Sequence, residues 1–207
     1  MVQYIPCHPD SIAGAHALHH RIIFNEQELK VCQAYIADNP RRLLIKRAHP
    51  DLFRVYNHLQ IGDMDMAACG NIFLLRDFNR MAVRIHRRWL DQELEDYRKK
   101  CFAVAENGGV LISPWIHQWE RAIRDEALDM GVRIISLRAD GFRERFKPSG
   151  KDFDLCQKGR LLFLAPWPHN HTDKIAREQT MSLNDMATLL ASTNPPARLK
   201  ATEVCQY

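Results

Sequence analysis

The feature that most constrains the fold of this chain is an alternation of short apolar runs and amphipathic helical patterns between residues 81 and 191. The apolar runs occupy residues 81–86, 110–112, 132–137 and 161–165. Apolar runs that alternate with helices are typical of buried parallel strands in βαβ units. We therefore predict an α/β fold: a Rossmann-like parallel sheet of about four strands with helices on both faces.

The helical patterns between these runs have recognisable ends. The first apolar stripe, which recurs at spacings of four and three residues, consists of Leu90, Leu94, Tyr97, Cys101 and Val104. It predicts a helix that ends in the Asn-Gly-Gly sequence of residues 107–109. Ser113 and Pro114 predict the N-cap and first residue of a second helix. Residues 141–159 are expected to form a loop, and Thr172 to open the last helix.

The part of the chain before these units is predicted to be a small helical segment. Asn25 is a suitable N-cap for a helix, and we expect Asn39-Pro40 to end it because the residue before a proline avoids the helical region. Residues 62–70 contain glycines at both ends and are expected to connect the two parts. The predicted organisation is thus an N-terminal segment (1–62), a Rossmann-like domain (63–191) and a weakly ordered tail (192–207).

Composition sets only broad limits on partners. The 29 basic and 25 acidic residues give a net charge of +4, which permits a polyanionic partner without requiring one. The six cysteines are scattered and form no Cys-x-x-Cys pair, so we expect free, partly buried thiols. No apolar run reaches membrane-spanning length, and the N-terminus lacks the pattern of a signal peptide. We expect a cytoplasmic protein with no membrane partner.

No complete catalytic constellation is visible in the sequence. Ser113 lacks the Gly-x-Ser-x-Gly frame of a nucleophile elbow. Glu120 is interpreted as an exposed helical carboxylate beside Arg121 and Arg124. The His169-Asn170-His171 pair has no further ligand at metal-binding spacing. We therefore expect no catalytic residue, no metal and no cofactor.

The fold rule for open α/β sheets locates a candidate site without any motif. Ligands of such sheets bind at the carboxyl ends of the strands. In this chain those ends are predicted at residues 86–88, 113–115, 137–140 and 165–169.

Three stretches of sequence have counterparts in a known family. They are residues 105–113 (AENGGVLIS), 120–131 and 159–165 (GRLLFLA). Together they make about residues 81–191 resemble the Rossmann-like domain of the DprA/Smf DNA-processing family. The family's first strand ends in Gly-Ser/Thr-Arg and its second is followed by Ser-Gly, whereas this chain has Ile-His-Arg at 85–87 and Ser-Pro-Trp at 113–115. The resemblance thus implies the fold, but with the glycine-based phosphate cradle lost.

A second resemblance concerns residues 20–53. His-Arg-Ile-Ile at 20–23 and Tyr-Ile-Ala-Asp-Asn-Pro-Arg-Arg-Leu at 35–43 resemble the C-terminal piece of single-tyrosine HUH transposases of the REP-associated type. In that resemblance Tyr35 corresponds to the family's nucleophile. No His-x-His pair precedes it at a suitable distance, so the catalytic half is missing. We interpret Tyr35 as a packed tyrosine at the edge of its helix's apolar stripe.

These patterns favour a non-catalytic nucleic-acid-binding accessory protein, similar to DprA/Smf and associated with mobile elements, with single-stranded DNA as the expected partner. The candidate contact residues, chosen for positive charge or an aromatic ring near strand ends and in the basic run, are Arg84, Arg87, Arg88, Trp115, Trp167, Lys174, Arg177, Arg41 and Arg42. One alternative is a small nucleotide-binding or phosphoribohydrolase-like enzyme of the Rossmann-like group. Another is a degenerate domain that acts through protein contacts, and the sequence leaves a homo-oligomer open.

Overall fold

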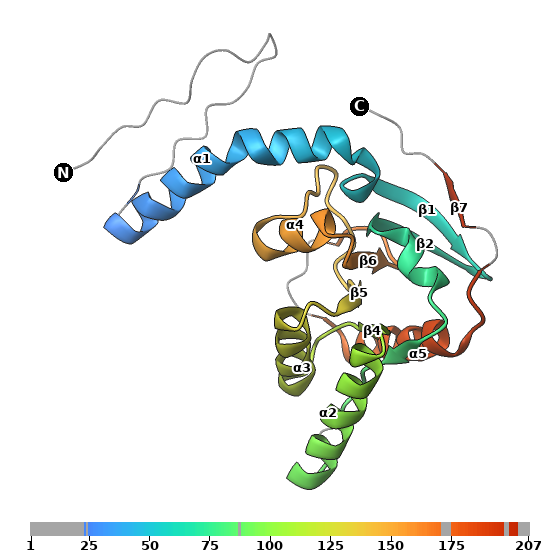
Figure 1. Ribbon diagram of the computed structural model, residues 1–207. Coiled ribbons are helices and arrows are strands. Elements are labelled where there is room, and N and C mark those ends of the chain that lie inside the picture. The colour runs from blue at the N-terminus through green and yellow to red at the C-terminus, as the bar shows by residue number, and fades with distance from the viewer. Residues whose placement is uncertain (1–22, 24, 87, 171–174, 197–198, 203–207) are drawn as a thin grey trace. The chain divides into compact units, whose positions relative to one another are not determined.

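The computed structural model describes residues 23, 25–86, 88–170, 175–196 and 199–202 of the chain (Figure 1). The chain divides into two compact units, one ending at Ala48 and the other beginning at His49.

The described part of the first unit is a single helix, α1 (Glu26–Ala48). Its N-cap is as predicted, because the Glu28 amide donates to Asn25 Oδ1 at 2.8 Å. The predicted stop at Asn39-Pro40 is wrong, since Pro40 lies inside the helix. A proline removes one backbone hydrogen bond, but residues 41–48 are mostly good helix formers and an Asp38–Arg41 ion pair at 2.5 Å joins the turns on either side.

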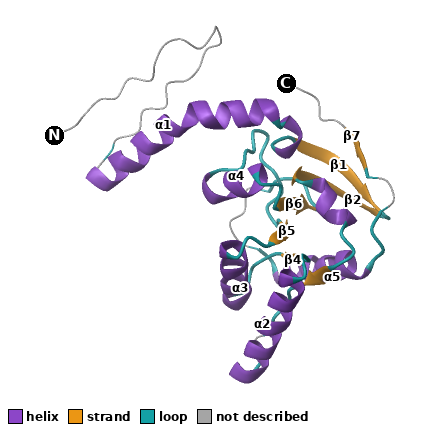
Figure 2. Cartoon of the chain, viewed as in Figure 1, coloured by secondary structure: helices purple, strands orange, loops and turns teal. Residues whose placement is uncertain are grey.

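The second unit is built on a seven-stranded mixed sheet (Figure 2). The strands are β1 (Val55–Ile61), β2 (Met64–Gly70), β3 (Arg80–Ala82), β4 (Val110–Ser113), β5 (Arg133–Leu137), β6 (Leu161–Ala165) and β7 (Lys200–Thr202), in the order β3-β4-β5-β6-β2-β1-β7. The four predicted strands correspond to β3 to β6, which are parallel neighbours in sequence order, and this confirms that part of the prediction; the first was expected over 81–86, but β3 ends at Ala82. Strands β2, β1 and β7 extend the sheet antiparallel and were not predicted.

The β1–β2 hairpin replaces the predicted connector at 62–70. Gly62 adopts φ 59° at its turn, so the expected boundary at residue 62 falls inside a hairpin. Gly70 ends β2 with φ 114°, and a Cβ there would lie 2.3 Å from the carbonyl oxygen of Leu161. Only glycine permits β2 to approach β6 this closely. The chain from 192 onward, expected to be weakly ordered, includes β7, which pairs with β1.

Helices lie on both faces of the sheet, as predicted. They are α2 (Asp91–Glu106), α3 (Gln118–Asp129), α4 (Gly150–Gln157) and α5 (Arg177–Ser192), with short 3₁₀ helices η1 (Pro50–Leu52) and η2 (Ile72–Arg76). Helix α5 packs its Leu183 and Leu190 against the face that includes Ile112. Helices α2, α3 and α4 contact β4, β5 and β6, where the alternate residues Leu111 and Ile134 are buried on the other face.

Two predicted helix starts and one predicted loop need correction. Helix α3 begins at Gln118 with His117 as its N-cap, four residues later than Ser113-Pro114 suggested. Helix α5 begins at Arg177, whereas Thr172 lies outside the described residues. The stretch 141–159 contains α4, whose Phe153 and Cys156 are fully buried against the sheet. The glycines around α4 and Pro148 are typical of a loop, so the sequence pattern did not indicate this two-turn helix.

The cysteines that are buried in the second unit behave as core residues. Burial raises the pKa of the Cys69 thiol and of the Cys101 thiol to about 12. Together with Cys32 and Cys156 they are free thiols, as expected for the described part of the chain. None of the helices within the described ranges combines the length and the apolarity needed to cross a bilayer.

Candidate nucleic-acid interface

The loop after β3 is held by side chains of the protein itself. The Val83 amide continues the ladder to the carbonyl of Ile112 at 2.8 Å. The next amide, of Arg84, donates to the hydroxyl of Tyr97 at 3.0 Å, and that hydroxyl donates to a backbone carbonyl of β3. Burial raises the pKa of Tyr97 to about 12, so the hydroxyl keeps its proton and this anchor persists at any physiological pH.

Glu120 is the central polar group at this edge of the sheet. The side chain is only 2% exposed, so the expectation of an exposed helical carboxylate is wrong. Its two oxygens accept hydrogen bonds from the amides of Ile85 at 3.1 Å, Ile116 at 3.1 Å and His117 at 3.2 Å. Because Glu120 is the third residue of α3, its carboxylate also lies at the positive end of the helix dipole. Glu120 therefore joins the loop after β3 to the loop after β4.

Trp115 occupies the space beside this carboxylate. It has φ 54°, the only positive φ of a non-glycine residue in the described part of the chain, and its side chain is 4% exposed. Its amide donates to Ser113 Oγ at 3.1 Å, and Ser113 is a buried strand residue rather than the N-cap that we expected. A ring buried to this extent has no open face on which a base could stack.

These contacts explain physically why the phosphate cradle is lost. In a Rossmann-like site the backbone amides after the first two strands face the ligand's phosphate. Here the amides of residues 84, 85, 115, 116 and 117 all donate to Tyr97, Glu120 or Ser113. An internal carboxylate thus satisfies the donors that an anion would otherwise meet. These five amides are therefore not available to a ligand at this edge.

A hollow of about 450 Å³ lies at the same edge, between the start of α3 and the first half of α5. Its lining residues are Ile85, Ile116, His117, Gln118, Glu120, Arg121, Thr180 and Asn184. We call this hollow the edge pocket. It combines an apolar wall with two side-chain amides and one guanidinium, a composition suited to a planar, hydrogen-bonding ligand.

One atom of the edge pocket lacks a partner. The Oδ1 atom of Asn184 is buried and accepts no hydrogen bond from the described residues. A buried carbonyl oxygen in that condition costs free energy unless a donor reaches it. Asn184 shares one side of α5 with Thr180 and Arg177, at helical spacings of four and three residues. Arg177 therefore stands one turn before the pocket on the helix that forms its wall.

The structure places the predicted contact residues in different environments. Arg84 forms an ion pair with Asp185 at 2.9 Å and is one-third exposed. Arg88 and Arg177 are exposed. Trp167 is half-buried and packs against the core of the unit. Arg87 and Lys174 lie outside the described residues.

The other two candidates, Arg41 and Arg42, belong to the first unit. Arg41 pairs with Asp38, and the Arg42 guanidinium lies 5.7 Å from the centre of the Tyr35 ring. Tyr35 is 56% exposed, so the expectation of a packed tyrosine is wrong. Of the residues that the sequence singled out in α1, Tyr35 and Arg41 are therefore exposed, whereas the Arg42 side chain is only 12% exposed.

Sequence reasoning missed the residues that line the edge pocket. Gln118 and Arg121 lie on exposed positions of α3 and Asn184 lies on a half-buried position of α5; the two helices are far apart in the sequence, and no motif joins them. The signal that could have found them is the displaced start of α3. Once His117 is the N-cap, the first turn of the helix lies at the carboxyl end of β4, where a ligand is expected.

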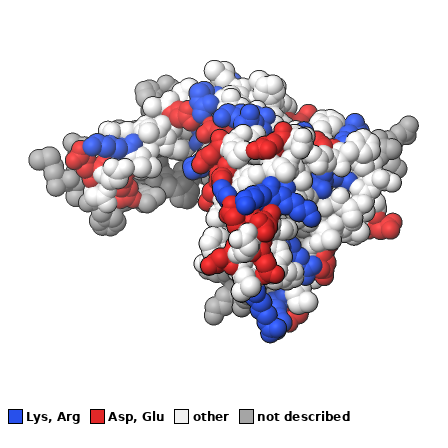
Figure 3. All heavy atoms as spheres, turned by 60° about the horizontal axis from the view of Figure 1, so that its bottom comes forward, with Lys and Arg blue, Asp and Glu red and all other residues white. Residues whose placement is uncertain are grey.

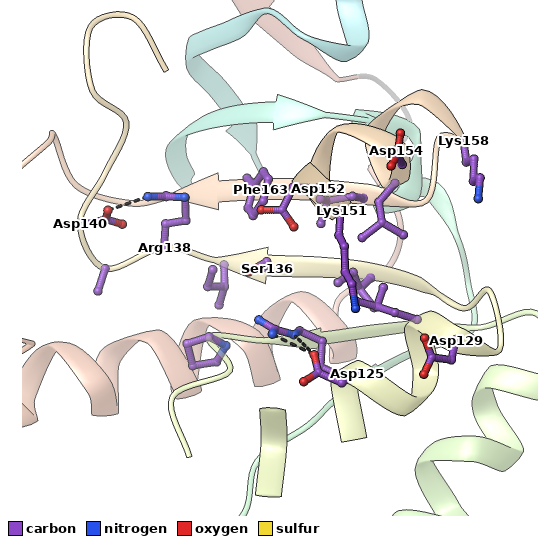
Figure 4. A pocket seen from close by; sticks show the side chains of 18 of the residues that line it. Asp125, Asp129, Ser136, Arg138, Asp140, Lys151, Asp152, Asp154, Lys158 and Phe163 are labelled. Carbon is purple, nitrogen blue, oxygen red and sulfur yellow. Dashed lines mark hydrogen bonds and ion pairs between the residues drawn. The ribbon is translucent and has the colours of Figure 1, made fainter. Parts of the chain in front are cut away.

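A larger groove of about 900 Å³ lies between α3 and α4, over β5 (Figure 4). Its charged lining residues are Arg124, Asp125, Asp129, Arg138, Asp140, Lys151, Asp152, Asp154 and Lys158. Asp125 pairs with Arg124 at 2.9 Å, and Asp140 pairs with Arg138 at 2.6 Å. With five acidic and four basic side chains, the groove offers no net attraction for a polyanion.

The acid, base and nucleophile candidates at the edge pocket are engaged in structural hydrogen bonds. His117 Nδ1 accepts from the Trp119 amide at 3.4 Å, and the Thr180 hydroxyl donates to the carbonyl of Ala176 at 3.2 Å. Within the described residues no three side chains of His, Cys, Asp or Glu come together in a group that could hold a metal ion. The arrangement is equipped to bind by hydrogen bonds and charge.

Comparison with known proteins gave no relative: no family model, no curated protein and no solved structure matches this chain.

Proposed function

We propose that this chain is a non-catalytic nucleic-acid-binding accessory protein that takes a single-stranded segment at the carboxyl edge of β3 and β4. The observation that carries the proposal is the edge pocket, which is lined by Arg121 and by Asn184, whose Oδ1 atom has no partner among the described residues. A base supplies the missing donor when the Asn184 side chain turns its Oδ1 toward the pocket, and the phosphate of that nucleotide meets the arginine. The resemblance of residues 81–191 to the DprA/Smf DNA-processing family supports the same class of partner.

Side chains replace the lost backbone cradle in this mode of binding. Arg121 lines the pocket on α3, Arg177 lies one turn before it on α5, and Arg88 follows β3. Guanidinium groups bind phosphate through paired hydrogen bonds and do not need glycine to let the backbone approach. Gln118 and Asn184 carry amides that can read the edge of a base. The internal Glu120 carboxylate remains in place throughout.

Single strands suit this site better than duplex. A base can enter a hollow only when it is unstacked and turned out of its strand. Acidic and basic side chains are interspersed on the face shown in Figure 3, so no broad field of one sign is there to hold a duplex backbone. We therefore assign binding to a few arginines and one base rather than to a charged surface.

The experiment is fluorescence-anisotropy binding of a labelled single-stranded oligonucleotide and its duplex to the full chain at several salt concentrations. We expect the single strand to bind at least about tenfold more tightly than the duplex, since only its bases are free to enter the pocket. Two or three phosphate contacts give a log–log salt slope of about −1.5 to −2 for a single strand.

Equal binding to the two forms, or no binding at low salt, would contradict the proposal. Titration with free mononucleotides provides the comparison. A mononucleotide that binds more tightly than the oligonucleotide would favour a small nucleotide-binding enzyme of the Rossmann-like group instead.

A further inference from the structure

Helix α1 presents an apolar line to the solvent. None of its residues is buried; Ile36 and Leu43 are each about half exposed, at 48% and 49%, and Leu29 is partly exposed. Leu29, Ile36 and Leu43 follow one another at intervals of seven residues, which is two helical turns. Cys32 lies between the first two on the same side. An apolar line at this spacing on an exposed helix, interrupted here only at Asn39-Pro40, is the pattern of a helix–helix contact.

The charges of α1 are separated along its length. Its first turn contains Glu26 and Glu28, and its last turn contains Lys46 and Arg47. Two parallel copies of the helix would place like charges together at both ends. Two antiparallel copies place the acidic first turn of each beside the basic last turn of the other.

We infer that α1 is a self-association surface, on which two copies of this chain pair their α1 helices antiparallel with Ile36 at the two-fold axis. Ile36 lies midway between Leu29 and Leu43, so this register sets Leu29 of one copy opposite Leu43 of the other. The same apolar line is therefore complementary to itself, as a two-fold interface requires. The inference concerns α1 alone and does not depend on the edge pocket.

Disulfide trapping tests both the contact and its direction. In a background with Cys7, Cys32 and Cys205 replaced by Ala, we would prepare Leu29→Cys and Leu43→Cys proteins and oxidise them separately and mixed. Antiparallel pairing predicts a covalent heterodimer in the mixture and little homodimer from either protein alone. Ala34→Cys, on the opposite side of α1, is the matched control and should stay monomeric.

Light scattering of the unmodified chain across a range of concentrations gives an independent reading. We expect a dimer whose dissociation constant rises at least about tenfold in Ile36→Glu, since the substitution sets two carboxylates together at the axis. Circular dichroism checks that the variant is folded. Homodimers from Leu29→Cys and Leu43→Cys alone would show parallel pairing and overturn the inference. A monomeric mass at every concentration, with no cross-link, would overturn it as well.

Discussion

Replacing Glu120 by Ala is expected to lower the free energy of unfolding of the α/β unit by about 3–4 kcal/mol, near the upper end of single-residue effects. The substitution leaves the amides of Ile85, Ile116 and His117 without their acceptor in a buried site. Each such loss costs about 1–3 kcal/mol, and the losses are not additive because the loops relax together. Urea unfolding followed by circular dichroism measures the change.

Two further variants show whether the cause is the carboxylate. Glu120→Gln keeps one carbonyl acceptor and is expected to cost about half as much. Asp129→Ala removes an exposed carboxylate from the same helix and should change stability by less than about 0.5 kcal/mol. If Glu120→Ala were as mild as Asp129→Ala, Glu120 would not be the group that joins the two loops.

Reversing the charge of Arg121 has the largest effect that we expect on binding. Arg121→Glu removes a phosphate contact at the edge pocket and adds a carboxylate there, so affinity for a single strand should fall at least about tenfold. The slope of the logarithm of the binding constant against the logarithm of the salt concentration should become shallower by the contribution of about one phosphate contact. The side chain is exposed, so the fold should be retained. Anisotropy titration at fixed salt measures the loss.

Arg124 supplies the matched control for this prediction. It lies one turn further along α3, lines the α3–α4 groove and pairs with Asp125. Arg124→Glu makes the same change of charge on the same helix, away from the edge pocket, and should alter affinity less than about threefold. Equal losses in the two variants would indicate general electrostatic attraction to α3 and would contradict a site at the pocket.

The parallel half of the sheet was predictable because two of its strands, β4 and β6, are buried on both faces. Residues 110–112 and 161–165 are uninterrupted apolar runs, and in a small α/β protein such a run usually forms a buried parallel strand. The antiparallel half was not predictable in the same way. Strand β1 alternates buried and exposed residues irregularly around a register shift, and β2 ends in a glycine that reads as a turn.

The candidate site was predictable in place but not in composition. The fold rule gave the carboxyl ends of all four predicted strands, and the edge pocket lies at two of these ends, where the missing glycines indicated that no phosphate cradle would form. Burial of Glu120 could not be read from the sequence, since the helical pattern put it on the same outer face as Arg121. The burial of Glu120 depends on the loop at 114–117, where Trp115 has a positive φ. A positive φ at a tryptophan cannot be predicted from the sequence.

The measurement that tests the central proposal most directly is a titration of the isotope-labelled chain with a single-stranded oligonucleotide, followed through the side-chain amide resonances of Gln118 and Asn184. Both amides belong to the edge pocket, and Asn184 has an oxygen without a partner until a ligand arrives. We predict that both resonances shift in a saturable manner and that free mononucleotides move them less. Binding of the oligonucleotide with both resonances unchanged would contradict a base in this pocket.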